Sequence, residues 1–85
     1  MSEPVISTIK VGTVLQGDGG VSTGAVVLAH KPSVDIEADV VLCYASSSLH
    51  SFVTWTYFHT TGSCMWGHYY DNIAEAVTDY ERRTL

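Results

Sequence analysis

The sequence predicts an α+β domain: an antiparallel β-meander of about five strands, with one C-terminal α-helix packed on one face of the sheet. Three observations indicate this fold. Apolar and polar residues alternate through much of the chain, which is the period of a strand. Short turn signals separate the alternating stretches, and the segment with helical spacing comes last. A chain of 85 residues has the size of one domain, so we expect residues 1–85 to fold as a single unit.

The first three strands are expected before residue 46. A Gly-rich turn separates the first two, because Asp-Gly followed by Gly supplies the positive φ angles of a tight hairpin. A Lys-Pro-Ser break precedes the third, which a short turn near Glu37–Asp39 would split; this alternative stays open. In order, the segments are the strand Val5–Leu15, the turn Gly17–Gly20, the strand Val21–His30, the break Lys31–Ser33 and the strand Val34–Ala45.

Three acidic residues alternate along the third predicted strand: Asp35, Glu37 and Asp39. Alternate residues of a strand lie ~6.6 Å apart, which spreads their carboxylates too far for a compact divalent-cation site. We therefore expect this stripe on a solvated edge face.

Most of the aromatic residues follow in an expected hairpin of two strands, Phe52–Thr60 and Cys64–Tyr70. A two-residue loop at Thr61-Gly62 and a four-residue loop closed by His59 and Cys64 give the same register. That register places Tyr57 opposite Trp66, and Trp55 opposite His68. Aromatic cross-strand pairs of this kind stabilise hairpins by up to ~1 kcal/mol each.

The predicted register divides the hairpin into two faces, and the helix can cover one of them. We expect the helix on the face that is apolar apart from threonines, while the Trp/Tyr/His face stays partly open; the reverse assignment is nearly as well supported. The first face carries Phe52, Thr54, Thr56, Phe58, Met65, Gly67 and Tyr69. The second carries Val53, Trp55, Tyr57, His59, Cys64, Trp66, His68 and Tyr70.

The Trp/Tyr/His face is the candidate site for a partner, because Trp and Tyr dominate the energetics of protein interfaces. The competing explanation is that these aromatics simply form the core. The predicted partner-binding residues are Trp55, Tyr57, His59, Trp66, His68 and Tyr70.

The helix is expected to begin at Asp71 or Asn72 as its N-cap. With Asn72 as the cap, Glu75 occupies the third helical position, in an arrangement like a capping box. One predicted helical face carries Ile73, Ala76, Val77 and Tyr80, and the rest of the surface carries Glu75, Asp79, Arg82 and Arg83.

Composition excludes several classes of function. Nine acidic residues against four basic ones give a net charge of −5, which disfavours direct binding to nucleic acid or to an anionic membrane. The longest apolar run, Val40–Ala45, is far too short to span a membrane, and the first residues do not resemble a secretion signal. We therefore expect a cytoplasmic protein, with Cys43 and Cys64 as reduced thiols rather than a disulfide.

No catalytic, metal or cofactor motif is present. The four histidines and two cysteines offer only one close candidate pair, His59 with Cys64, whereas zinc needs four converging ligands. The same pair would sit at a hairpin end without a pocket or an oxyanion donor, so it does not predict a nucleophile. We expect no enzyme activity and no cofactor.

These observations predict a small non-catalytic protein-binding module. The stretch Trp66–Asp71 and the helix after it resemble small proteins of high-GC bacteria and their phages, and this resemblance implies a phage or mobile-element accessory protein that binds and modulates a host protein. Two alternatives stay open. One is a structural subunit of a homo-oligomer, favoured by exposed strand edges. The other is an acidic nucleic-acid mimic that uses the Asp35–Asp39 stripe.

Overall fold

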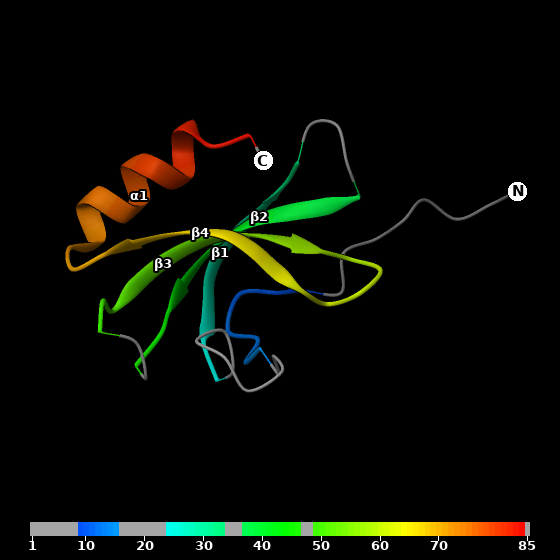
Figure 1. Cartoon of the computed structure of the whole chain (residues 1–85), viewed down its shortest axis with the longest axis horizontal. Coiled ribbons are helices and arrows are strands. Elements are labelled where there is room, and N and C mark those ends of the chain that lie inside the picture. Colours follow the sequence, from blue (N-terminus) through cyan, green and yellow to red (C-terminus); the bar gives the residue numbers. More distant parts are fainter. Residues whose placement is uncertain (1–8, 16–23, 34–36, 47–48, 85) are drawn as a thin grey trace, which may run out of the picture.

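The computed structural model describes residues 9–15, 24–33, 37–46 and 49–84. Within them, four strands form one sheet in the order β1-β2-β3-β4, each antiparallel to its neighbour. The elements are β1 (Val26–Pro32), β2 (Ala38–Tyr44), β3 (Phe52–Phe58), β4 (Cys64–Tyr70) and the helix α1 (Ile73–Arg82) (Figure 1). The predicted α+β meander with a C-terminal helix is confirmed, with four strands in place of about five.

The described part of the first predicted strand does not join the sheet as a strand. Gly12 has a φ of 90°, which turns the chain out of the extended conformation, and the Thr13 amide donates back to the Lys10 carbonyl at 3.0 Å. Val14 then forms one isolated antiparallel bridge with Val26. Alternation alone did not reveal this turn, and the predicted turn at Gly17–Gly20 lies outside the described residues.

One face of the sheet, here called the core face, carries the main apolar core. Val41, Cys43, Val53 and Trp55 are buried there, together with Ile9 and Leu15 from the segment that precedes the sheet. The segment is held against β1 by backbone hydrogen bonds: the Gly12 amide donates to the Val27 carbonyl at 2.7 Å. Residues 9–15 therefore act as a cover for the core face rather than as a fifth strand.

The helix α1 covers the opposite side, here called the helix face, which carries Val40, Leu42, Thr54 and Thr56 (Figure 1). The helix therefore lies on the predicted face of β3. Gly67 and Tyr69 of β4, expected on that same face, lie on the core face instead, so the prediction is wrong for β4. Ala76 is fully buried, but Ile73, expected on the covered face, is 48% exposed. Asp79 and Arg83, expected on the outer surface, turn toward the threonines of the sheet instead, because the hydroxyls there offer hydrogen-bond partners.

The start of α1 agrees with the capping signal. Asn72 is the N-cap, and its Oδ1 accepts from the amides of Ala74 at 2.7 Å and Glu75 at 3.4 Å. Glu75 occupies the third helical position, where its negative charge lies near the positive end of the helix dipole.

The β3–β4 hairpin has the predicted strands but a different register. Tyr57 lies opposite Cys64 rather than Trp66, and the Phe58 amide donates to the Ser63 carbonyl across the loop. Farther from the loop a β-bulge interrupts the pairing, so that Thr54 lies opposite His68. Because successive side chains alternate between faces, one extra residue moves every later side chain to the other face.

Candidate functional site: the outer strand β4 and its bulge

The six predicted partner-binding residues do not share one face. Trp55 is only 3% exposed and belongs to the core, with Tyr57 and His59 half-buried on the same side. The bulge carries the later residues away from them. His68 and Tyr70 turn toward α1, and Trp66 packs against Phe58, with ring centroids 5.7 Å apart. The predicted open face is therefore wrong as a single surface. Of the six, Trp66 and His68 are exposed.

Trp66 has an unusual backbone. Its φ of 57° lies in the left-handed region, where it is the one residue other than glycine among those described. For an L-residue with a bulky side chain this conformation costs about 1–2 kcal/mol. Trp66 is nevertheless 54% exposed as a whole residue, so its own burial offsets only part of that cost. Something else must hold Trp66 in place.

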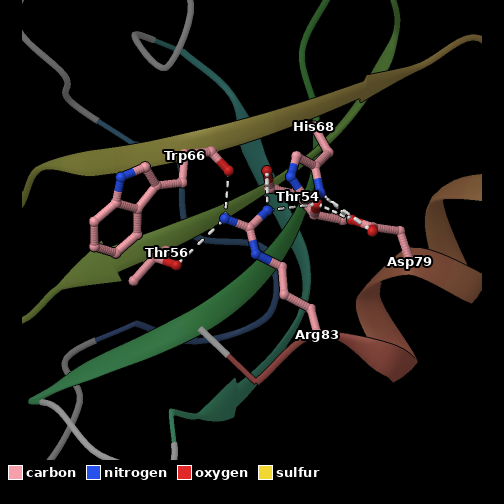
Figure 2. A network of polar contacts seen from close by, with 6 residues as sticks. All are labelled: Thr54, Thr56, Trp66, His68, Asp79 and Arg83. Atoms are coloured by element: carbon pink, nitrogen blue, oxygen red, sulfur yellow. Dashed lines mark hydrogen bonds and ion pairs between the residues drawn. The ribbon is translucent and has the colours of Figure 1, made fainter.

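Arg83 supplies that restraint from beneath the strand (Figure 2). Its guanidinium is buried, and one arm, Nη1, donates to the carbonyl oxygen of Thr54 at 3.0 Å and to the hydroxyl of the same residue at 2.9 Å. The other arm, Nη2, donates to the hydroxyl of Thr56 at 3.4 Å and to the carbonyl oxygen of Trp66. One side chain at the end of α1 therefore ties the bulge of β4 to β3.

Asp79 completes the same polar network (Figure 2). Its carboxylate accepts from the Thr54 hydroxyl at 2.5 Å and from His68 Nδ1 at 3.0 Å. Burial alone would raise the pKa of Asp79, but the hydrogen bonds from Thr54 and His68 outweigh it and hold the pKa below its ordinary value. Burial lowers the pKa of Arg83, a change that the charge of Asp79 opposes. The hydroxyl of Thr54 links the two charged groups.

Gly67 fixes the bulge from the opposite face. A Cβ atom on Gly67 would lie 2.6 Å from Nε1 and 2.9 Å from Cδ1 of Trp55, so only glycine fits without a shift of the core indole. Tyr69 then packs edge-on against the same indole, with ring centroids 6.2 Å apart. The bulge is thus held by the core on one side and by Arg83 on the other.

The exposed part of β4 is here called the β4 edge surface and comprises Met65, Trp66, His68 and Tyr69. β4 is an outer strand, and no other strand among the described residues pairs with its free side. The strand contains no Lys, Arg, Asp or Glu. An apolar, uncharged edge of this kind can bury its side chains and pair its backbone groups with another chain.

An open hollow of about 300 Å³ lies beside the end of β4, under the flank of α1. It is lined by Tyr70, Glu75, Thr78, Asp79 and Arg82. Burial raises the pKa of the Tyr70 hydroxyl, and the negative charges of Asp79 and Glu75 raise it further, against an opposing effect of Arg83. Two carboxylates, Glu75 and Asp79, therefore lie close to this hydroxyl.

A second polar cluster lies on the core face. The carboxylate of Asp39 is almost fully buried and accepts from His30 Nδ1 and His59 Nε2, each at 2.9 Å. The expectation of a solvated acidic stripe is thus wrong for Asp39; Glu37 is exposed, and Asp35 lies outside the described residues. Because His30 lies in β1, Asp39 in β2 and His59 directly after β3, the cluster ties neighbouring strands together.

The two cysteines lie in buried or half-buried positions. Both cysteines are free thiols, as expected from the sequence. Burial raises the pKa of Cys64 to about 11 and that of Cys43 to about 12, the latter with a contribution from Cys64, so the nucleophilic thiolate is scarce at neutral pH. No three potential ligands among the described residues are arranged to hold a metal ion.

The described residues form a small α+β meander. Its exposed edge strand, β4, is held by polar contacts with Asp79 and Arg83. Comparisons with protein-family models, curated proteins and solved structures gave no match. No helix in the described ranges combines the length and the apolar character needed to cross a bilayer.

The sequence named Trp66 and His68 as candidates, and both are exposed, but it did not point to Thr54, Asp79 and Arg83, which contact them. One signal for the bulge was available, because a glycine inside a strand often marks such a site, and Gly67 directly follows Trp66. The partners of Arg83 lie between 17 and 29 residues away, so no local pattern connects them.

Proposed function

We propose that this protein is a non-catalytic protein-binding module whose binding site is the β4 edge surface. The observation that carries the proposal is Trp66, a half-exposed indole held in a costly backbone conformation by a buried arginine. Backbone strain of this kind persists where the surroundings enforce it, and it clusters at binding sites. Exposed Trp is also the side chain most enriched among the residues that dominate protein interfaces.

The role that fits this site is that of a small accessory protein, of phage or mobile-element type, that modulates a host protein in the cytoplasm. The net charge of −5 disfavours nucleic acid or an anionic membrane as the direct partner. The two free thiols are compatible with a reducing compartment. The high pKa values of both thiols support a binding role rather than thiol catalysis.

The test asks whether partner binding depends on the indole ring of Trp66 or only on the stability of the fold. Tagged wild type, Trp66→Ala and Trp66→Gly are used for affinity purification from the native host, followed by mass spectrometry. Both variants lose the ring, but glycine accepts a positive φ, so Trp66→Gly should be more stable than Trp66→Ala by about 0.5–1 kcal/mol. We expect both variants to fold and both to lose the partner recovered by wild type.

Leu49→Ala is the matched control, because Leu49 is an apolar side chain, 91% exposed, outside the β4 edge surface. It should recover the partner as wild type does. Retention of the partner by a folded Trp66→Gly variant would overturn the proposal. Equal losses from Leu49→Ala and Trp66→Gly would show that general stickiness, rather than this site, drives the association.

A structural subunit of a homo-oligomer is the second candidate, favoured by the unpartnered side of β4 within the described sheet. Sedimentation equilibrium on the purified full chain distinguishes the two. A monomer at high micromolar concentration excludes the homo-oligomer and leaves the binding module.

A further inference from the structure

We propose that the partner binds as an extended strand added to the free side of β4, and that it places a lysine or arginine side chain in the hollow beside Tyr70. This inference rests on the proposed function and specifies the conformation and charge of the partner segment. It draws on three features: the edge of β4, the position of α1 above that edge, and the charges that line the hollow.

The edge of β4 is suited to strand addition. Natural edge strands are commonly protected by Lys, Pro or other charged residues, which obstruct pairing with a second chain. β4 contains none of these, and no strand among the described residues covers its outer side. The bulge at Trp66 leaves regular pairing on either side, at Cys64–Met65 and at His68–Tyr70. The second stretch lies directly beside the hollow, which Tyr70 helps to line.

The helix places one flank over this edge. Asp79 bonds to His68 of β4, whereas Tyr80, the next residue, lies toward β1, with Lys31 Nζ 4.9 Å from its ring centroid. The flank on the Asp79 side also carries Glu75 and Arg82, spaced at helical intervals. A strand added ~4.8 Å outside β4 would direct alternate side chains to the same face as His68 and Tyr70, which is the face that holds the hollow.

The charges of the hollow select a basic side chain. Two carboxylates, Glu75 and Asp79, line it together with one guanidinium, Arg82. Besides burial, the charges of Asp79 and Glu75 raise the pKa of the Tyr70 hydroxyl, which agrees with this balance. The ring of Tyr70 also provides an aromatic face for a cation, which adds to the attraction. A lysine or arginine entering from the partner strand would therefore be favoured over a glutamate or aspartate.

The other face of the added strand meets a different environment. Tyr69 is 42% exposed on the core-face side of the edge, and it packs on Trp55. Partner residues pointing to that side would be apolar. The expected recognition sequence thus alternates basic with apolar residues, because side chains in a strand alternate between faces.

The first experiment defines the preferred peptide. A displayed library of random linear peptides is selected against the full-length protein, and the enriched peptides are synthesised. The expected result is a pattern in which Lys or Arg alternates with apolar residues. Enrichment of acidic, helical or patternless sequences, or no enrichment at all, would overturn the inference.

The second experiment locates the basic residue, using the synthetic peptide in calorimetric titrations. Glu75→Lys reverses a charge that lines the hollow, and Glu81→Lys makes the same change on an exposed helical residue that does not. We expect Glu75→Lys to weaken binding by about tenfold and Glu81→Lys to have a much smaller effect. Equal losses would indicate general electrostatic attraction and would contradict the assigned position.

The third experiment tests strand addition itself. Methylation of alternate backbone nitrogens of the peptide should abolish binding when those nitrogens face β4 and should have little effect when they face away. Hydrogen exchange should slow at β4 amides on binding. Equal effects of both methylation patterns would overturn the inference. The inference would also be overturned if β4 pairs with a second copy of the protein and the peptide therefore does not bind.

The inference and the proposed function fail in different ways. If the natural partner depends on Trp66 but is unaffected by Glu75→Lys and does not protect the β4 amides, the binding module stands and strand addition is wrong. If the partner is indifferent to Trp66, the proposed function itself is wrong.

Discussion

Replacing Arg83 is the most direct test of how the β4 edge surface is built. Arg83→Met keeps a long, unbranched apolar side chain in the site, so little cavity results. It removes the four hydrogen bonds described above, two of which go to the backbone carbonyl oxygens of Thr54 and Trp66. The bulge would lose its connection to the end of α1.

The magnitude follows from those acceptors. A buried acceptor that loses its donor costs about 1–3 kcal/mol, while the hydroxyls of Thr54 and Thr56 can reorient toward other partners. With two carbonyl oxygens affected, Arg83→Met should destabilise the fold by about 2–4 kcal/mol, a large part of the ~5–10 kcal/mol expected for a domain of this size. Arg83→Lys should destabilise the fold by less than Arg83→Met does but still measurably, because an ammonium group cannot reproduce the forked geometry of a guanidinium.

Urea unfolding followed by circular dichroism measures the loss, with Arg82→Met as the control. Arg82 is the preceding residue, carries the same charge and is exposed, so its replacement should change the free energy of unfolding by less than about 0.5 kcal/mol. If Arg83→Met costs no more than Arg82→Met, the buried network does not hold the bulge, and the reasoning that links Trp66 to a binding role loses its physical basis.

Three further predictions concern the core, the acid limit of stability and the thiols. Gly67→Ala should cost about 1–3 kcal/mol, because the new Cβ would overlap the buried Trp55; an unchanged melting temperature would contradict the close contact. The lowered pKa of Asp79 means that its stabilising effect is complete above about pH 4 and is lost as pH falls through the lowered value. Asp79→Asn should therefore cost stability at neutral pH, and its difference from wild type should shrink in acid; urea titrations at neutral and acidic pH measure this, and a constant difference would refute it. Burial and the raised pKa values of Cys43 and Cys64 predict little alkylation by iodoacetamide in the folded protein and rapid alkylation in urea, measured by mass spectrometry; fast labelling of the folded state would show that the core face is open.

The features predicted correctly from the sequence depend on neighbouring residues. The strand β4 has the predicted limits Cys64–Tyr70, and β3 begins at Phe52 as expected. The helix begins after its Asn72 cap, because that cap acts on amides only two and three residues away. Alternation and capping depend on residues close together in the chain, so a short stretch of sequence is enough to predict them.

The features that were missed depend on residues far apart. Asp39 is buried because His30 and His59 enclose it, and these lie 9 and 20 residues away. The hairpin register changed because a single bulged residue breaks the alternation that the prediction extended through the whole strand. The first predicted strand is interrupted at Gly12, which has a positive φ in the structure. From the sequence alone, a glycine at this position is compatible with either a strand bulge or a turn.

Because of the bulge at Trp66, the number of residues in β4 decides which face of the sheet each later side chain occupies. Removing one residue there would restore regular pairing and rotate His68 and Tyr70 onto the core face, while Tyr69 would move beneath α1. Every other side chain would be retained, but Asp79 would lose its hydrogen bond to His68, and a tyrosine hydroxyl would enter the core in place of a ring edge. The number of residues in β4 is therefore constrained more tightly than the identity of most of them. Over evolutionary change, we expect this strand to tolerate substitutions at its exposed positions far better than an insertion or deletion of one residue.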